Sequence, residues 1–218
     1  MTIPAKHQDT TSREHLLNIS ESLFISDGMD AVSLRAIARA AGQKNPSALH
    51  YHFGSREELI EAIVARRLRQ QEARRAELLR EVVLKSDDVG LREVCAVLLG
   101  GAYFLCREDA SFRDALGVFG LRYFTSTSDY FSLELSQSSP SLMELWRLGF
   151  KALSHLPHQI LALRMENAYG AGLLAMSRRA RNKGSFRGRH AELFFNNLVD
   201  QVAAMLNCPV SDATEAIL

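Results

Sequence analysis

One short stretch, from Ser33 to Arg56 (SLRAIARAAGQKNPSALHYHFGSR), constrains the fold of this 218-residue chain more than any other. Its apolar residues recur at helical spacing in two blocks, Leu34-Ile37-Ala38-Ala41 and Leu49-Phe53. Gly42 lies between the blocks, where a helix can end in a left-handed residue at little cost. Asn45 followed by Pro46 is the N-cap and first-turn pattern that begins a new helix. The stretch therefore predicts two short helices, 33–41 and 46–53, joined by a tight turn.

The second of these helices predicts a binding surface. If Leu49 and Phe53 are buried one turn apart, then Ser47, His50 and Tyr51 point away from the core. Hydroxyl, imidazole and phenol groups are suited to DNA phosphates and base edges. The whole stretch also contains four Lys or Arg residues and no Asp or Glu. These features predict a DNA-binding helix-turn-helix whose second helix lies in the major groove.

The predicted DNA-contacting residues are Ser33, Arg35, Lys44, Asn45, Pro46, Ser47, His50, Tyr51, His52 and Arg56. We expect Ser47, His50 and Tyr51 to face bases or phosphates. Lys44, Asn45 and Arg56 are expected on the DNA backbone. Because the net charge of the whole chain is only +1, binding would depend on this local excess of cations.

Helices are predicted on both sides of this stretch. Thr11-Ser12-Arg13-Glu14 forms a capping box that predicts a helix over 12–27, which Gly28 ends. A second capping box, Ser55-Arg56-Glu57-Glu58, predicts a long amphipathic helix over 55–84. No strand pattern appears in the chain. The remaining predicted helices are 88–106, 110–124, 140–156, 158–182 and 187–206, which makes the fold class all-α.

This order of elements resembles the TetR family of transcriptional regulators. The family pattern, roughly T-x-x-x-I-A-x-x-A-G and then A-L-Y-x-H-F-x-S-K-E-x-L, is met by Ser33, Ile37-Ala38, Ala41-Gly42, Ala48-Leu49, His52-Phe53, Ser55, Glu57 and Leu59. The resemblance implies a helix-turn-helix head, residues 1–54, and a helical effector-binding and dimerisation body, residues 55–218. It also implies a homodimer on a palindromic operator, most often a repressor, whose DNA affinity changes when a small molecule binds.

The last two long helices, 158–182 and 187–206, are the expected dimer contact. Helix 187–206 has a broad apolar stripe that includes Phe194, Phe195 and Leu198, and Gly172 is among the small residues of helix 158–182. Both helices could simply cover the core of the body. The resemblance instead implies that they pair with the same two helices of a second subunit. For Phe195 both an interface position and a core position remain open.

An unknown small-molecule effector is the third expected partner, besides double-stranded DNA and a second subunit. Its predicted lining residues are aromatic or polar groups on apolar helices: Phe104, Phe119, Trp146, Phe150, Arg164 and Asn167. Plain core packing is the alternative for each aromatic residue. The serine- and threonine-rich segment 125–139 could be a loop or a lid. The basic segment 178–189 could be a solvated loop, a second nucleic-acid contact or a gate for anions.

No catalytic residue, metal site or cofactor is predicted. Gly170-Ala-Gly172-Leu-Leu-Ala175 matches a dinucleotide-binding fingerprint, but it lies inside a helical pattern, where close helix packing explains it better. The chain has no apolar run of about 18 residues and no signal-peptide pattern, so we expect a cytoplasmic protein that does not enter membranes. The alternatives in other classes are a helical cofactor-dependent enzyme and an architectural DNA-binding protein without an effector.

Overall fold

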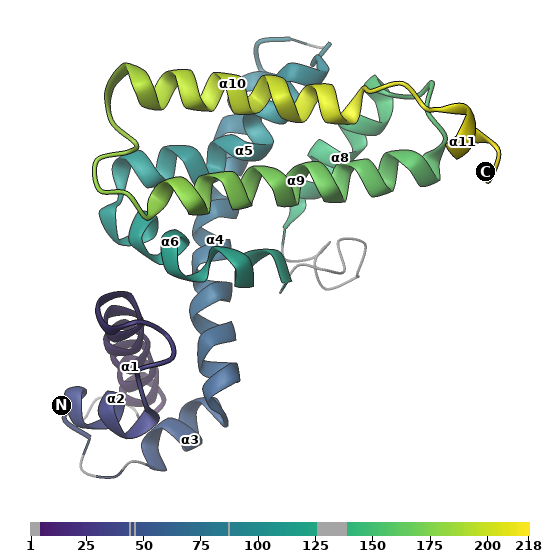
Figure 1. The fold of residues 1–218 in the computed structure, drawn as a ribbon. Helices are drawn as coiled ribbons and strands as arrows, with labels where there is room; N and C mark the ends of the chain where they lie inside the picture. Colours follow the sequence, from purple (N-terminus) through teal and green to yellow (C-terminus); the bar gives the residue numbers. More distant parts are fainter. Residues whose placement is uncertain (1–4, 44, 46, 87, 126–138) are drawn as a thin grey trace.

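The computed structural model describes residues 5–43, 45, 47–86, 88–125 and 139–218. All regular elements among these residues are α-helices (Figure 1). In chain order they are α1 (Ala5–Asp27), α2 (Leu34–Ala40), α3 (Ser47–Phe53), α4 (Arg56–Val83), α5 (Leu91–Glu108), α6 (Ala110–Thr125), α8 (Pro140–Ala152), α9 (His158–Ala180), α10 (Gly188–Leu206) and α11 (Asp212–Glu215). The predicted all-α fold class is therefore confirmed.

The first three helices form a small head at one end of the molecule (Figure 1). Its core is built from one apolar face of each helix, and Leu16, Phe24, Ile37, Leu49 and Phe53 are all buried there. A helix as short as α2 or α3 is unstable alone, so its order depends on this shared core. The head therefore holds α3 in a fixed position on its surface.

The long helix α4 joins the head to the rest of the chain (Figure 1). It begins at the predicted cap, because the Ser55 hydroxyl accepts a hydrogen bond from the Glu58 amide at 3.1 Å. Its 28 residues correspond to about 42 Å at ~1.5 Å per residue. Leu59 and Ile63 are buried near its start and Leu79 near its end. The same rigid helix thus contributes to the head and to the body.

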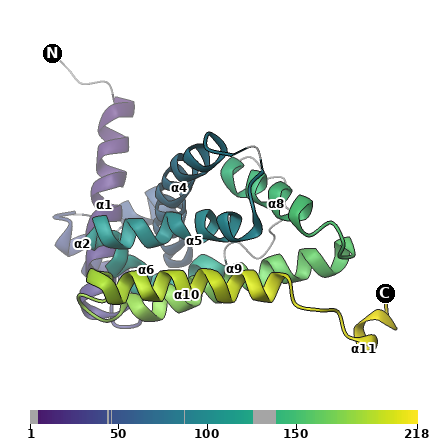
Figure 2. The same cartoon turned by 90° about the horizontal axis from the view of Figure 1, so that it is seen from above.

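The body consists of the second half of α4 together with α5, α6, α8, α9 and α10. Helices α5, α6 and α8 pack on α4, whereas α10 packs on α5 and α9 (Figures 1 and 2). Two glycines of the body permit close helix crossings. A Cβ atom at Gly101 of α5 would lie 2.9 Å from the main-chain oxygen of Gln71 on α4. A Cβ atom at Gly172 of α9 would collide with Leu99 of α5. The small residue Gly172 therefore serves packing inside one subunit, as expected for close helix packing rather than for dinucleotide binding.

The largest differences between the predicted helices and the structure are at α1, α8 and α11. Helix α1 begins at Ala5 and runs through Thr11-Ser12-Arg13-Glu14, so that this apparent capping box is not a helix start. Helix α8 ends at Ala152 instead of 156, consistent with the restriction that Pro157 places on the residue before it. The four-residue helix α11 was not predicted, because one helical turn leaves no periodic pattern to detect.

The apolar stripe of α10 faces the interior of the body. Leu198 is buried, and the ring of Phe195 stacks on Tyr103 of α5 with centroids 4.1 Å apart and an angle of 13° between the planes. Phe195 also lies against Phe104, at a centroid distance of 5.9 Å. Phe195 therefore packs against the core of its own subunit, where aromatic pairs are stabilising, but its ring is only partly buried.

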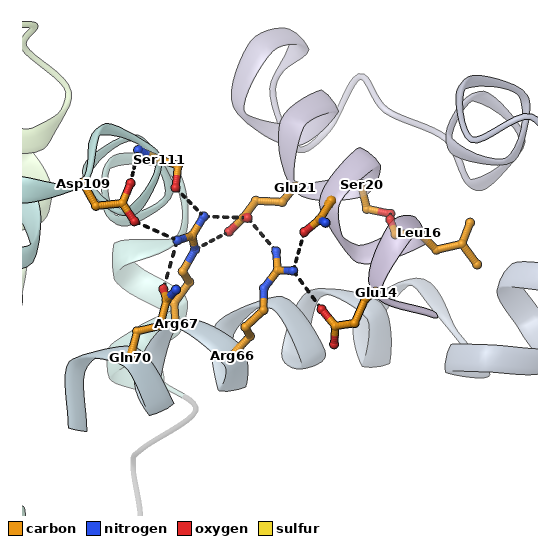
Figure 3. Close-up of polar contacts among 10 residues, drawn as sticks. Glu14, Leu16, Ser20, Glu21, Arg66, Arg67, Gln70, Asp109 and Ser111 are labelled. Atoms are coloured by element: carbon orange, nitrogen blue, oxygen red, sulfur yellow. Dashed lines mark hydrogen bonds and ion pairs between the residues drawn. The ribbon is translucent and has the colours of Figure 1, made fainter. Parts of the chain in front are cut away.

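A buried carboxylate ties the head to the body (Figure 3). Glu21 of α1 accepts two hydrogen bonds from Arg67 of α4, from Nε and from Nη2, each at 2.7 Å. It accepts a third from Nη2 of Arg66, also at 2.7 Å. Arg67 Nη2 in turn donates to the Ser111 hydroxyl at 3.2 Å, in the first turn of α6. One acid and two guanidinium groups thus connect α1, α4 and α6.

Other contacts reinforce this junction on either side. Phe24 of α1 meets Phe119 of α6 edge to face, with centroids 6.1 Å apart. Arg122 near the end of α6 pairs with Glu57 at the start of α4, at 3.0 Å. Asp109, just before α6, lies 3.7 Å from Arg67. Burial acts to raise the pKa of Asp109, but hydrogen bonds from Ser111 and nearby backbone amides, together with Arg67, lower it overall.

The buried position of Glu21 leads to a prediction about stability. Glu21→Ala leaves Arg66 and Arg67 without their shared anion, and breaking a buried pair in this way costs about 3–5 kcal/mol. Glu14→Ala is the matched control, because Glu14 is on the same helix and also pairs with Arg66, at 3.3 Å, but is half-exposed. Its cost should be below about 1 kcal/mol. Urea unfolding followed by circular dichroism measures both values, and equal costs would contradict a special role for Glu21.

Candidate nucleic-acid interface

The turn between α2 and α3 is held by the predicted capping residues. The Ser33 hydroxyl accepts a hydrogen bond from the Ala36 amide at 3.2 Å and so begins α2. Gly42 follows α2 with a φ of +66°, a conformation that favours glycine. The Asn45 side-chain oxygen accepts from the Ser47 amide at 3.0 Å and so begins α3. Lys44 and Pro46 lie outside the described residues, and their predicted DNA contacts stay predictions.

Helix α3 has one buried face and one exposed face. Leu49 and Phe53 are buried in the head. Ser47 and His50 are exposed, and Tyr51 has 77% of its surface accessible to solvent. An aromatic ring with a polar tip is rarely left so open without a partner, and such rings are common in binding surfaces. The exposed face is the one that the sequence predicted.

His50 already makes one contact inside the head. Its Nδ1 atom lies 2.5 Å from the carbonyl oxygen of Gly54, which follows α3. A carbonyl can only accept a hydrogen bond, so Nδ1 carries the proton. In the neutral ring Nε2 is then an acceptor. It could accept a hydrogen bond from the amino group of adenine or cytosine in a major groove.

Exposed cations lie next to this face. Arg35 and Arg39 project from α2 and are both exposed. Within the described part of the chain, neither forms an ion pair or a side-chain hydrogen bond. Asn45 is also exposed, at the turn before α3. Cationic side chains beside a short exposed helix suit binding to DNA phosphates.

Two of the ten residues predicted to contact DNA also make contacts within the head. Arg56 Nη2 donates to the backbone oxygen of Met29, and its guanidinium group lies over the ring of Phe24 at 5.4 Å. His52 is half-buried and lies against Tyr51, with ring centroids 5.1 Å apart. The structure therefore gives Arg56 a role in joining the α1–α2 loop to α4, which the sequence analysis did not foresee.

The predicted effector-lining residues are spread over α5, α6, α8 and α9. Phe119 packs on α1 at the junction, and Phe104 packs on Phe195 of α10. Phe150 of α8 stacks on His158 with centroids 4.7 Å apart. These contacts are those of the core-packing alternative, and the predicted effector contacts stay predictions.

The other three predicted effector residues have different surroundings. Trp146 is buried on α8, and Asn167 is exposed on α9. Arg164 of α9 donates from Nη1 to the backbone oxygens of Leu206 at 3.1 Å and Cys208 at 2.5 Å. Cations bind the carbonyl end of a helix favourably, so Arg164 serves as a cap for α10.

The described residues do form open hollows at the junction of head and body. One, of about 580 Å³, lies between α1, α6 and the end of α9, and Ile25, Gly117 and Arg181 are among its lining residues. A second, of about 370 Å³, contains Glu21 and Arg67 in its wall. None of the six predicted effector residues lines either hollow.

Three features of the described residues bear on metal binding, thiol reactivity and membrane crossing. No cluster of three or more His, Cys, Asp or Glu residues suitable for a metal ion occurs among the described residues. Burial raises the pKa of the Cys95 thiol to about 12, which makes it a poor nucleophile at neutral pH. Likewise, no described helix combines the length and the apolar character that a membrane crossing requires.

The sequence analysis missed a row of polar residues inside the body. Ile63, Arg67, Gln71, Arg75 and Leu79 follow one another at intervals of four along α4, and all five are buried. The signal was present in the sequence, because three polar residues occupy positions that continue the core-facing stripe of an amphipathic helix. Buried polar residues of this kind demand partners.

The geometry of α2 and α3 defines a helix-turn-helix DNA-binding head. Residues 16–63 match the sequence profile of "Bacterial regulatory proteins, tetR family". The match confirms the predicted resemblance to this family over the helix-turn-helix region of the chain. It extends from α1 into the first third of α4.

Two solved structures are similar to nearly the whole chain. RolR, in a complex with its ligand resorcinol, is 16% identical with a TM-score of 0.48, over 95% of this chain and 98% of that one. The probable transcriptional regulatory protein RHA5900 is 21% identical with a TM-score of 0.48, over 91% of this chain and 99% of that one. A comparison with curated protein sequences finds no match.

The different surroundings of Arg35 and Arg56 lead to a second prediction. Arg35→Gln should leave the stability of the head unchanged and weaken binding to all DNA sequences alike, with a salt slope lower by about one ion. Arg56→Gln should lower the stability by about 1–3 kcal/mol, because the Met29 carbonyl loses a charged donor. Thermal unfolding and salt-dependent fluorescence anisotropy with labelled DNA distinguish the two. If Arg56→Gln weakened DNA binding without loss of stability, and Arg35→Gln lowered the stability instead, then Arg56, and not Arg35, would face the DNA.

Proposed function

We propose that this protein is a ligand-responsive, homodimeric transcriptional regulator that binds a palindromic operator, most often as a repressor, in the cytoplasm. The observation that carries the proposal is the exposed face of α3, where Ser47, His50 and Tyr51 surround the buried pair Leu49 and Phe53. A helix held in this way at the surface of a small head can enter a major groove.

In the proposed complex, the exposed face of α3 reads base edges. Tyr51 and the Nε2 atom of His50 are the groups best placed for this role, because Nδ1 of His50 is already bound to Gly54. Arg35, Asn45 and the N-terminal end of α3 would contact phosphates and fix the register. A lost base contact is worth about 1–3 kcal/mol, whereas a lost phosphate contact acts on all sequences alike.

Dimerisation through α9 and α10 is supported by what these helices leave exposed. They lie side by side on one face of the body (Figures 1 and 2). Leu163 and Leu174 of α9 and Leu193 and Met205 of α10 are large apolar side chains open to solvent. Exposed apolar groups concentrated on two adjacent helices are typical of a protein interface. A two-fold dimer would present two copies of α3 to two half-sites about 34–36 Å apart.

The two alternatives require different behaviour. A cofactor-dependent helical enzyme would show turnover and retain its cofactor, whereas the family to which the head belongs consists of regulators. An architectural DNA-binding protein would bind DNA with the same affinity whatever small molecules are present. Titration of the protein into the intergenic DNA that flanks its gene, with and without candidate ligands, distinguishes the regulator from the enzyme and from the architectural protein.

A third prediction tests the recognition face. Tyr51→Ala should weaken binding to the specific operator by about 1–3 kcal/mol and leave the circular dichroism spectrum unchanged. Tyr51→Phe keeps the ring and removes only the hydroxyl, so it separates a packing contact from a hydrogen bond. Mobility-shift titrations against operator and scrambled DNA give the two affinities. Equal operator affinity for Tyr51→Ala and wild type would show that this face does not read the DNA.

A fourth prediction tests the interface. Leu174→Glu and Leu193→Glu should each convert the dimer to a folded monomer, because burying an unpaired charge costs several kcal/mol. Leu174 and Leu193 are 57% and 66% exposed in the single chain, so neither change should unfold it. Leu121→Glu is the control, since this leucine of α6 is as exposed, at 64%, but lies on another helix.

Sedimentation velocity and circular dichroism provide the measurements for these variants. Loss of the dimer in the α9 and α10 variants alone supports the proposed interface. A stable dimer in all three variants would exclude this face as the contact.

A further inference from the structure

The core of the body contains a buried cluster of polar side chains from α4, α8 and α9. Gln71 and Arg75 are one turn apart on α4 and therefore share a face. The Gln71 side-chain nitrogen donates to the hydroxyl of Tyr169 on α9 at 2.9 Å. The guanidinium group of Arg75 lies 5.9 Å from the centre of the same ring. Arg75 is only 2% exposed, so its charge lies deep inside the protein.

The nearest acid to Arg75 is already satisfied by other groups. Glu72 accepts hydrogen bonds from the Ser141 amide at 2.7 Å and from the Ser141 hydroxyl at 2.8 Å, one on each carboxylate oxygen. Ser141 lies in the first turn of α8, where the helix dipole also stabilises an anion. Arg75 Nη1 lies 3.5 Å from this carboxylate, an ion-pair contact without a hydrogen bond. Glu72 is therefore stabilised largely by α8.

Three buried polar atoms in this cluster have no hydrogen-bond partner. They are Nε and Nη1 of Arg75, both donors, and the side-chain oxygen of Gln71, an acceptor. Unsatisfied buried polar groups are rare in proteins, and those that occur need a specific explanation. Here the two donors and the acceptor come from the same face of one helix. A single molecule with both kinds of group could satisfy all three.

We propose that this cluster binds the effector, and that the effector is a small organic acid that also carries a hydroxyl group. Its carboxylate accepts hydrogen bonds from Arg75, and its hydroxyl donates to the oxygen of Gln71. This inference rests on the proposed ligand-responsive function and names the chemistry of its ligand. The apolar part of the molecule lies among the buried side chains of α8, which include Leu142, Leu145 and Trp146.

The charge balance favours an acid over a neutral ligand. Because Glu72 has its own donors on Ser141, a second anion can pair with Arg75 without displacing the first. Charge-assisted hydrogen bonds are the stronger kind, above all where water is excluded. A neutral amide would offer one acceptor oxygen without the charge and would bind more weakly.

The experiment uses the full-length protein and four probes: benzoate, 3-hydroxybenzoate, hexanoate and benzamide. The single tryptophan of the chain, Trp146, lies on α8 and reports binding by its fluorescence. Thermal shift gives a second, independent signal. We expect the carboxylates to bind and to raise the melting temperature, with 3-hydroxybenzoate the tightest, and benzamide to bind at least about tenfold more weakly than benzoate.

Variants identify the residues. Arg75→Met should lower the affinity for every carboxylate by about tenfold or more. Gln71→Leu should lower the affinity for 3-hydroxybenzoate and leave that for benzoate nearly unchanged. Arg74→Met is the matched control, because Arg74 is the adjacent residue but pairs with Glu77 and Glu108 near the surface. It should bind all probes like the wild type.

Clear results would overturn the inference. One is that no carboxylate binds the wild-type protein, a test that requires no variant to fold. Another is that benzamide binds as well as benzoate, or that Arg75→Met and Arg74→Met bind alike. DNA binding by the same preparations is measured separately by fluorescence anisotropy. If DNA binds but no acid binds, only this inference fails, whereas binding of acids without any binding of DNA would contradict the proposed function.

Discussion

The position of the head depends on one buried carboxylate. Glu21 of α1 accepts three hydrogen bonds from Arg66 and Arg67 of α4, and Arg67 continues to Ser111 at the start of α6 (Figure 3). A buried acid between two guanidinium groups is tightly restricted in geometry, because any displacement leaves charges without partners. The relative orientation of α1, α4 and α6 is therefore fixed more sharply here than by apolar packing, which tolerates small shifts.

The same helix brings this junction into contact with the buried polar cluster of the body. Arg67, Gln71 and Arg75 lie on one face of α4 at intervals of one turn, so about 12 Å of rigid helix separates the first from the last. In the proposed mechanism, a ligand that draws Arg75 toward its carboxylate shifts or rotates α4. Arg67 then moves relative to Glu21 and Ser111, and the head must follow. In this mechanism the ligand-binding cluster and the DNA-binding head are coupled, because both act on α4. The coupling is reciprocal, so DNA binding would change the affinity for the ligand by the same factor as the ligand changes the affinity for DNA.

The parts of the fold that sequence could predict are those that depend on neighbouring residues. The caps at Ser33, Asn45 and Ser55 and the positive φ of Gly42 are set by contacts within a few positions, and all four appear in the structure. Parts that depend on distant contacts were not predictable. Arg56 binds the carbonyl of Met29, which is 27 residues away, and no local pattern reveals such a partner. Phe104 and Phe119 were chosen as aromatic residues on apolar helices, a description that fits core and pocket residues equally well.

The row of polar residues along α4 also explains why the core of the body is not built for greatest stability. Replacing a buried ion cluster by apolar side chains often stabilises a protein, so a core that keeps Gln71 and Arg75 with unsatisfied atoms carries a cost. A loss of stability of this kind is usual at functional sites, where some polar groups are left without hydrogen-bond partners in the protein. A ligand that satisfies these atoms stabilises only the conformation that holds it. In the proposed mechanism, the free energy gained when a ligand satisfies these atoms is available to shift α4, and through Glu21 to change the separation of the two heads of a dimer on the DNA.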